Sequence, residues 1–409
     1  MRVAYYSPLP PERSGIADYS ALLLPALRRR FDVEVARRRR PVLRRTDVAL
    51  YHVGNNPQAH GWIVDALRRR PGVVVLHDLV LHHLVAGLTL ARGNPGAYIA
   101  AMERDGGEEA RRLAEAVSRG RQRPPWETAP ERYPLAGAIL DHATGLIVHS
   151  HYTERGARAE GYAGKIWRIP LAAAPVPDVP PARIDGSPLI GSFGHVNPAK
   201  RIPQLLRAFV QLRKSHPDAR LVLAGAIAPG FELDRRIDGL GLQGAVVSSG
   251  YVDDRTLWSL MAACDVIVSL RAPTMGETSA AALQALALGK PLVVSALGWF
   301  AELPPEAARQ IPVGGPEIDV LADALEELTA DETLRRRMGD AAIEYVRTEH
   351  DLEHVAEQYL GALEWALGGD TVTDAVLAEV AQAAAEVEIG ADSPELAAIA
   401  RELRESDLV

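Results

Sequence analysis

The sequence predicts an α/β protein with two doubly wound, Rossmann-like halves, each a parallel sheet covered by helices. Three observations carry this prediction. Short apolar runs alternate with segments of helical periodicity along most of the 409 residues, which is typical of repeated βαβ units. A proline-rich stretch interrupts the alternation near residue 180. The chain is also too long for one ordinary core. We therefore expect two sheets with a cleft between them.

The first half contains short apolar runs that we expect to form strands, because turn-forming or polar residues flank each of them. Between them lie longer segments in which apolar residues recur with helical periodicity. The predicted strands are 2–7, 33–36, 48–52, 73–77, 145–149 and 165–170, and the predicted helices are 18–30, 61–70, 79–91, 95–121 and 133–143.

A proline-rich connector follows, and it marks a domain boundary because proline stiffens a linker and cannot donate to a strand ladder. Its prolines are Pro170, Pro175, Pro177, Pro180, Pro181 and Pro188. The alternation then resumes. The predicted strands are 189–194, 220–224, 246–250, 265–270 and 291–295, and the predicted helices are 201–216, 233–239, 256–264, 279–288 and 316–329.

The C-terminal part reads as helical. Residues 334–368 predict two further helices, and the acidic, alanine-rich segment 369–409 predicts a helical tail. We interpret this tail as a packing or self-association element rather than a catalytic one. The sequence leaves the oligomeric state open.

Composition excludes several classes of protein. The net charge of −8 argues against general nucleic-acid binding. The single cysteine, Cys264, excludes an internal disulfide framework and fits a reducing cytoplasm. No stretch approaches the roughly 20 apolar residues that span a bilayer. The N-terminus reads as a strand rather than a signal peptide. We therefore expect a cytoplasmic protein.

An arginine cluster stands out in this acidic chain. The segment from Arg28 to Arg45 contains nine arginines. It is either a solvated surface or a patch that attracts an anionic lipid surface or a phosphorylated ligand. Peripheral contact with the inner face of a membrane therefore stays open.

The first chemical motif lies where the strand 189–194 ends. Gly194 would let the backbone approach a ligand, and Lys200 follows near the start of the next helix. Free N–H groups and the helix dipole favour phosphate at such a position. Lysine is rare in this chain, since Lys165, Lys200, Lys214 and Lys290 are the full set. Its placement here predicts a phosphate contact, although an ordinary surface lysine is the alternative.

A second motif, Pro273-Thr274-Met275-Gly276-Glu277-Thr278-Ser279, opens the predicted helix 279–288 and is followed by Gln284. Together the two motifs resemble the donor-binding half of GT-B glycosyltransferases, specifically the retaining enzymes of glycosyltransferase family 4. The resemblance covers about residues 1–368. It implies an acceptor-side domain over 1–180, a donor-binding domain over 181–350 and a helix at 351–368 that returns to the first domain. It also implies transfer of a hexosyl group from a nucleotide diphosphate sugar to a sugar, lipid-linked or small-molecule acceptor, without a cofactor or metal.

The motifs depart from the family pattern in three places. His195 stands where the family has arginine, and Gln284 stands at the second conserved glutamate of the pattern, which binds the ribose. Gly276 falls on the first glutamate position, so Glu277 comes one residue late. The resemblance assigns Glu277 and Lys200 to catalysis. It assigns the diphosphate to Gly194, His195, Lys200, Gly276, Thr278 and Ser279, and the ribose or base to Gln284 and Tyr251.

The first half supplies the other wall of the expected cleft. Gly15, after the first strand, resembles the family's glycine loop that faces the diphosphate; a plain helix start is the alternative. His77 ends a strand and resembles the histidine that contacts the transferred sugar, with a core histidine as the alternative. On the acceptor side we expect Asn55, Asn56, Asp78 and His82.

Other patterns are weaker. Residues 239–244 fit GxGxxG, but they follow a helix and precede a strand, so we interpret them as a helix end and turn. Asp253 and Asp254 predict a helix cap rather than a metal pair. Two other functions stay open: an epimerase or phosphorylase on the same scaffold, or a non-catalytic sugar-nucleotide binder. The base, the sugar and the acceptor are not readable from the sequence.

Overall fold

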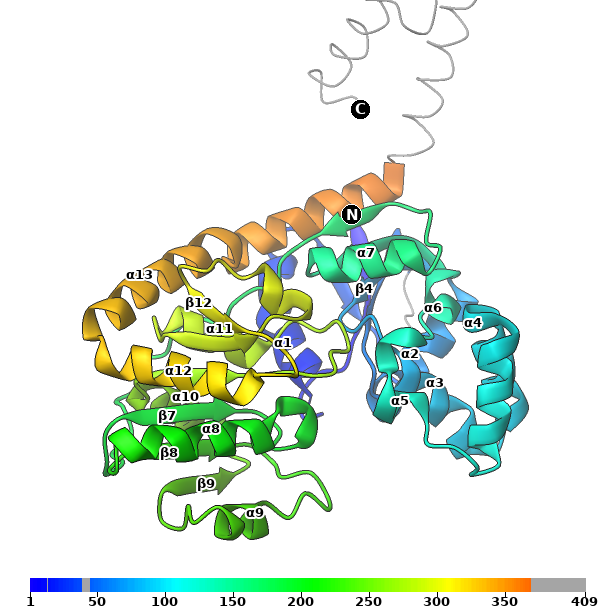
Figure 1. Ribbon diagram of the computed structural model, residues 1–409. Helices are drawn as coiled ribbons and strands as arrows, with labels where there is room; N and C mark the ends of the chain where they lie inside the picture. Colours follow the sequence, from blue (N-terminus) through cyan, green and yellow to red (C-terminus); the bar gives the residue numbers. More distant parts are fainter. Residues whose placement is uncertain (13, 39–44, 369–409) are drawn as a thin grey trace, which may run out of the picture.

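The computed structural model describes residues 1–12, 14–38 and 45–368. Two six-stranded sheets have the orders β2-β1-β3-β4-β5-β6 and β12-β11-β10-β7-β8-β9, and neighbouring strands run parallel throughout. This confirms the predicted α/β class with two doubly wound halves. Figure 1 shows the two halves side by side, with helices packed around both sheets.

The strands of the first sheet are β1 (Arg2–Tyr6), β2 (Asp32–Val35), β3 (Val48–Val53), β4 (Gly72–Leu76), β5 (Ala143–Val148) and β6 (Ile166–Arg168). Its helices are α1 (Gly15–Arg28), α2 (Pro57–Arg69), α3 (His82–Leu88), η1 (Leu90–Arg92), α4 (Pro95–Ser118), α5 (Pro125–Thr128), η2 (Pro130–Arg132), α6 (Gly137–Leu140) and α7 (His151–Ala159). Every residue of β3 and β4 is buried, as expected for central parallel strands covered on both faces.

The second sheet contains β7 (Leu189–Phe193), β8 (Arg220–Ala224), β9 (Val246–Gly250), β10 (Val266–Ser269), β11 (Leu292–Ser295) and β12 (Ala308–Ile311). Its helices are η3 (Pro198–Lys200), α8 (Ile202–Ser215), α9 (Leu233–Gly239), α10 (Asp254–Ala263), α11 (Ala280–Ala287), η4 (Gly298–Glu302), α12 (Glu317–Ala330) and α13 (Glu332–Glu349), and residues 352–368 form a last helix. Asp253 caps α10 by accepting a hydrogen bond from the amide of Thr256.

Several elements differ from the sequence prediction. Helix α7 and the short elements α5, η2 and η4 were not predicted. The predicted helix 133–143 is reduced to the single turn α6, because Leu135 takes a left-handed backbone with φ of 56° that a helix does not tolerate. The strand β12 was not predicted. It lies at the edge of its sheet and its sequence Ala-Arg-Gln-Ile is half polar, so it lacks the apolar run of a central strand.

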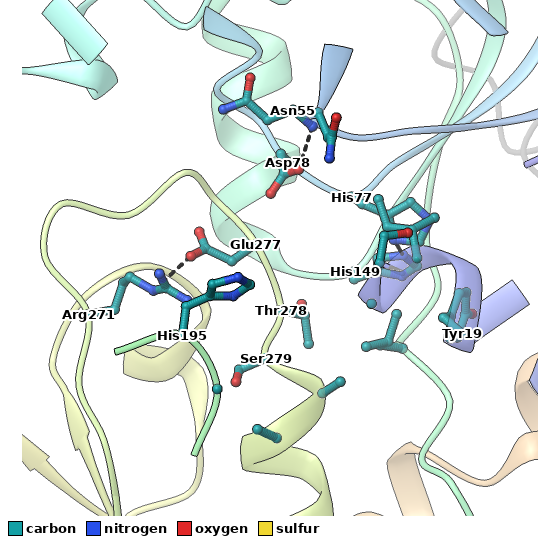
Figure 2. Close-up of a pocket in the computed structure, with 18 of the residues that line it drawn as sticks. Tyr19, Asn55, His77, Asp78, His149, His195, Arg271, Glu277, Thr278 and Ser279 are labelled. Atoms are coloured by element: carbon teal, nitrogen blue, oxygen red, sulfur yellow. Dashed lines mark hydrogen bonds and ion pairs between the residues drawn. The ribbon is translucent and has the colours of Figure 1, made fainter. Parts of the chain in front are cut away.

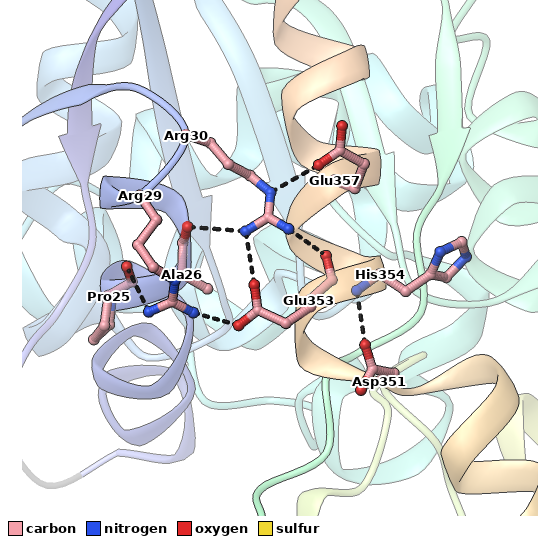
Figure 3. A network of polar contacts seen from close by, with 8 residues as sticks. All are labelled: Pro25, Ala26, Arg29, Arg30, Asp351, Glu353, His354 and Glu357. Atoms are coloured by element: carbon pink, nitrogen blue, oxygen red, sulfur yellow. Dashed lines mark hydrogen bonds and ion pairs between the residues drawn. The ribbon is translucent and has the colours of Figure 1, made fainter.

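The last helix returns to the first domain (orange in Figure 1). Trp365 packs edge-on against Trp167 with ring centroids 5.2 Å apart, and the hydroxyl of the buried Tyr359 lies 3.4 Å from that of Tyr19. Figure 3 shows the polar contacts at the other end of the helix. There the Arg30 guanidinium binds Glu353 and Glu357, each at 2.9 Å.

Part of the arginine cluster from Arg28 to Arg45 forms ion pairs with the last helix, since Arg29, like Arg30, pairs with Glu353. Residues 39–44 of the cluster and the predicted tail 369–409 lie outside the described residues. Within the described part of the chain, no helix is long and apolar enough to cross a membrane.

Candidate active site

A cleft of about 460 Å³ lies where the carboxyl ends of strands from both sheets face each other. Open parallel sheets bind their ligands at this edge. The cleft brings together most of the residues expected from sequence, namely Gly15, Asn55, Asn56, His77, Asp78, Gly194, His195, Lys200, Glu277, Thr278 and Ser279. It adds others that the sequence did not single out for it, among them Tyr19, His60, His149, Leu171 and Arg271.

Two helix N-termini open into this cleft, one from each domain. Ser14 caps α1 by accepting a hydrogen bond from the amide of Ala17 at 3.1 Å. Ser279 caps α11 in the same way, accepting from the amide of Ala282 at 3.3 Å. A Cβ built on Gly15 would meet no atom within 4 Å, so its side faces open space. The positive ends of two helix dipoles therefore face one volume, which favours an anion.

Lys200 lies at the base of the same volume and is almost fully buried, with 8% of its surface exposed. Its Nζ donates a hydrogen bond to the carbonyl of Phe193 at 2.8 Å. It also lies close to Gly194, where a built Cβ would come within 2.6 Å of Nζ. Burial and, to a smaller extent, the positive charge of Arg271 lower the pKa of Lys200 to about 7, although the charge of Glu277 acts in the opposite direction. An anion in the cleft would remove both penalties.

Glu277 is held firmly within its loop. Its Oε2 accepts hydrogen bonds from the amide of Met275 at 2.7 Å and from Thr274 Oγ1 at 3.1 Å, while Oε1 pairs with Arg271 Nε at 2.8 Å. Figure 2 shows Arg271 and His195 on the same side of the cleft as Glu277, with Asp78 opposite. The sequence prediction missed Arg271.

Asp78 is the acidic group of the first domain in this cleft. Its Oδ2 accepts a hydrogen bond from the amide of Asn55 at 2.8 Å, and Asn55 is itself fixed because its Oδ1 accepts from the amide of Leu84 at 3.0 Å. Burial and, to a smaller extent, the charge of Glu277 across the cleft raise the pKa of Asp78 to about 7. A carboxyl group whose pKa lies near 7 is suited to binding or transferring a proton.

Three buried histidines form a hydrogen-bonded row beneath the cleft. His149 Nδ1 lies 2.8 Å from the carbonyl of Ile169, His149 Nε2 lies 3.2 Å from His77 Nδ1, and His77 Nε2 lies 3.0 Å from His52 Nδ1. Burial lowers the pKa of all three, to about 4 for His149. A carbonyl can only accept, so His149 Nδ1 carries the hydrogen, and each neutral ring in turn donates from Nδ1 and accepts at Nε2.

This row limits what His77 can do. Both of its ring nitrogens already bind other histidines, so the ring has no free nitrogen for a substrate in this arrangement. Its exposed edge lines the cleft beside Tyr19, with ring centroids 5.5 Å apart. No local sequence pattern predicts the row, because its members lie on or directly after three different strands.

Four residues expected in the site lie elsewhere. His82 is fully buried, with its nitrogens 3.0 Å from the Tyr133 carbonyl and 2.9 Å from the Tyr98 hydroxyl, so it supports the core. Gly276 packs on Leu79 at the domain contact and its amide donates to Thr274 Oγ1. Gln284 lies one turn further along α11, and the exposed Tyr251 follows β9; both lie beyond the residues that line the cleft.

Among the described residues, no group of three or more histidine, cysteine, aspartate or glutamate side chains is arranged to hold a metal ion. Lys200, Arg271 and the two helix N-termini are the groups in the cleft that favour an anion.

Residues 179–345 match the family described as glycosyl transferases group 1. The matched segment spans most of the second domain, which is about two fifths of the chain. The match includes the wall of the cleft formed by Gly194, Lys200, Arg271 and Glu277. The domain also resembles curated proteins. A D-inositol 3-phosphate glycosyltransferase from Stackebrandtia nassauensis is 27% identical over 188 residues, which is 44% of this chain and 42% of the relative.

A second relative is the lipopolysaccharide core biosynthesis mannosyltransferase LpcC from Rhizobium leguminosarum. It is 28% identical over 192 residues, which is 46% of this chain and 53% of that protein. The chain thus spans about half the length of the curated relatives that it matches.

Solved structures resemble the whole described fold. Sucrose-phosphate synthase from Thermosynechococcus elongatus superimposes with a TM-score of 0.63 at 19% identity, covering 89% of this chain and 98% of that one. HepE from Anabaena, in complex with UDP and glucose, gives 0.57 at 16% identity, covering 89% and 99%. WaaG, a glycosyltransferase involved in lipopolysaccharide biosynthesis, gives 0.56 at 14%, also covering 89% and 99%. At these identities the likeness shows the fold, and the described chain has a GT-B fold.

Proposed function

We propose that this chain transfers a hexosyl group from a nucleotide diphosphate sugar to an acceptor hydroxyl, with retention of configuration and without a metal ion. One observation carries the proposal. Lysine, arginine and two capped helix N-termini from both domains converge on one cleft at the carboxyl ends of the sheets. The group 1 family match of the second domain supports it. We further propose the cytoplasm as the site of action.

The physical task in this reaction is to stabilise the departing diphosphate. Groups that are already oriented toward the developing charge do this without reorganising during the reaction. Lys200 supplies an ammonium group, and the amides at the start of α11, beside Thr278 and Ser279, supply donors. The Thr278 hydroxyl is buried and has no hydrogen-bond partner among the described residues, so it is available to a phosphate oxygen. Gly194 and Gly15 let the ligand come close to the backbone.

The sugar would lie between the two domains, with Glu277 on one side and the edge of His77 on the other. Glu277 is anchored by its own loop, so it can accept a hydrogen bond from a sugar hydroxyl without moving. Asp78 faces the acceptor side together with Asn55 and Asn56. In a retaining reaction of this kind the leaving phosphate can take the acceptor proton, so Asp78 needs only to orient the acceptor hydroxyl.

The nucleoside would extend from the cleft along α11 toward Gln284 and Tyr251. Gln284 keeps a carbonyl acceptor for the ribose but lacks the charge of a glutamate. Several structural neighbours, including HepE from Anabaena, were solved with UDP. We therefore propose a uridine diphosphate sugar as the first donor to test.

The test is turnover with a panel of nucleotide sugars in the presence of a chelator. We expect release of free nucleoside diphosphate with one donor class, faster when a suitable acceptor is added, and NMR of the product should show the anomeric configuration of the donor. An inverted product would contradict retention, and loss of turnover with chelator would contradict metal independence.

A second candidate function is favoured by two particular residues. His195 and Gln284 replace groups that the family uses for the diphosphate and ribose, so the cleft could hold a sugar nucleotide without acting on it. Tight binding of a donor together with no hydrolysis and no transfer over a broad acceptor panel would identify a non-catalytic binder.

A further inference from the structure

The diphosphate site of the proposed enzyme has a gap at residue 195. His195 is exposed at the mouth of the cleft, where the related motif has an arginine. A guanidinium is charged at any physiological pH and can bind two phosphate oxygens at once, whereas an imidazole is charged only when it is protonated. Without an arginine at 195, Lys200 is the candidate cation that the segment after β7 offers to a diphosphate.

The sheet register places an arginine beside this gap. Strands β7 and β10 are neighbours, and Ile190 pairs with Val266 and Gly191 with Ile267. The two strands end at Phe193 and Ser269. Residue 195 is the second residue after β7 and residue 271 is the second after β10. Arg271 and His195 therefore lie in the loops that follow two neighbouring strands, and Figure 2 shows their side chains near each other on one side of the cleft. The amide of Ala272 donates to the carbonyl of Ala199 at 2.8 Å, which joins the two loops.

The surroundings of Arg271 match this placement. Its side chain is 20% exposed and lines the cleft, and its backbone amide donates to Ser295 Oγ at 2.9 Å, which fixes the start of its loop. Its charge acts on Lys200 strongly enough to lower the pKa of that lysine. Two cations are thus held near each other in a largely buried place, an arrangement that an anion would stabilise.

We propose that Arg271 is the second diphosphate cation of this protein, relocated from the loop after β7 to the loop after β10. The inference rests on the proposed function. Without a ligand, Glu277 neutralises Arg271 through its contact at 2.8 Å. A bound diphosphate would share the guanidinium with Glu277, so the pair also links the phosphate site to the residue proposed to face the sugar.

The alternative is that Arg271 only supports the loop that carries Glu277. The two roles differ in which ligand groups they affect. A phosphate contact requires Arg271 for pyrophosphate and for nucleoside diphosphates but not for the bare nucleoside. A role in loop support would change all ligands together and would lower the stability of the domain.

The experiment is a titration of inorganic pyrophosphate, a panel of nucleoside diphosphates and the matching nucleosides into the full chain. The variants are Arg271→Gln, His195→Arg and the double variant, with Arg309→Gln as a matched control because Arg309 pairs with Glu327 away from the cleft. We expect Arg271→Gln to weaken pyrophosphate and diphosphate binding at least tenfold. We expect His195→Arg to restore most of this loss, and the control to bind like the native chain.

Arg271→Gln binding within twofold of the native chain would overturn the inference while leaving the proposed function standing. An equal loss of affinity for nucleosides and for diphosphates in Arg271→Gln would also overturn it. So would a double variant that binds no better than Arg271→Gln, provided that both variants are as stable as the native chain. If Arg271→Gln does not fold, Arg271→Lys replaces it, with a smaller expected loss confined to the phosphorylated ligands. If the native chain binds pyrophosphate but no nucleotide, the role of Arg271 as a phosphate-binding cation stands and the proposed nucleotide sugar donor is contradicted. If it binds neither pyrophosphate nor any nucleotide, both the inference and the proposed function are contradicted.

Discussion

At the scale of single residues, burial decides the chemistry of this cleft more than residue type does. Lys200 and Asp78 both have pKa values shifted to about 7 by burial, from opposite directions. The sequence proposed both residues as candidates because each follows a strand end, and both line the cleft. Their electrostatic state could not be predicted, since it depends on atoms from both domains.

Lys200 should couple donor binding to proton uptake. Its pKa is low while the cleft is empty, and a bound diphosphate raises it, so above pH 7 binding must bring a proton with it. Affinity should therefore fall as pH rises from 7 to 9, by up to about tenfold per pH unit. Calorimetric titration in buffers of different ionisation enthalpy measures this uptake. Lys200→Met should bind weakly with no uptake, and a pH-independent affinity in the native chain would contradict this account.

The histidine row should make the fold sensitive to acid. His52, His77 and His149 have pKa values lowered in the folded state, so the unfolded chain binds more protons below its ordinary histidine pKa of about 6.5. The free energy of unfolding should then fall between about pH 6.5 and 5, by up to about 1.4 kcal/mol per pH unit for each histidine. The raised pKa of Asp78 acts in the opposite direction and offsets part of this slope.

Urea unfolding at several pH values measures this slope. His149→Gln should make it shallower, whereas His354→Gln, which changes an exposed histidine, should leave it unchanged. An equal slope in both variants would mean that the row does not carry the effect.

At the scale of elements, the loop from Arg271 to Ser279 and the start of α11 carry much of the site. The motif at 273–279 identified this loop from sequence, but it suggested a phosphate role for Gly276 that the packing does not support. Arg271 was missed because its significance lies in the register between β7 and β10, a pairing between residues far apart in the chain. The sequence prediction missed β12 for a similar reason, since its pairing with β11, and not its composition, defines it as a strand.

Alanine at Gly276, which packs at the domain contact, and at Gly15, which lines the cleft, should have different effects. Gly276 has φ of +81°, and its Cβ would come within 2.6 Å of Leu79 Cβ; Gly276→Ala should lower the free energy of unfolding by about 1–3 kcal/mol. Gly15 has open space around its Cβ, so Gly15→Ala should preserve stability but weaken nucleotide binding by intruding on the cleft. Denaturant unfolding and ligand titration of both variants separate the two effects, and a stability loss in Gly15→Ala would contradict this interpretation.

At the scale of the whole molecule, the last helix follows the second domain in the chain and packs on the first. The alternation of strands and helices predicted both sheets, and the resemblance predicted the returning helix. The orientation of the two sheets relative to each other could not be predicted from local sequence patterns. Contacts such as those of Tyr359 with Tyr19 join residues more than 300 positions apart, which no local sequence pattern reveals.

The tie between the domains should depend on buried contacts rather than on its ion pairs. Glu353 and Glu357 are mostly exposed, so Glu353→Gln with Glu357→Gln should cost less than about 1 kcal/mol. Tyr359 is fully buried, and Tyr359→Ala should cost about 3 kcal/mol or more. Chemical unfolding compares the two. A larger loss in the double glutamine variant would show that the polar network of Figure 3 dominates instead.

The most direct test of the central claim, that the cleft holds a nucleotide diphosphate sugar at Lys200, is thermal stabilisation by UDP, GDP, ADP, TDP and CMP. At about 100 times its dissociation constant, a bound nucleotide should add about 2.7 kcal/mol of stability. We predict a clear shift for one diphosphate, which is lost in Lys200→Ala. No shift with any nucleotide, or an undiminished shift in Lys200→Ala, would contradict the account.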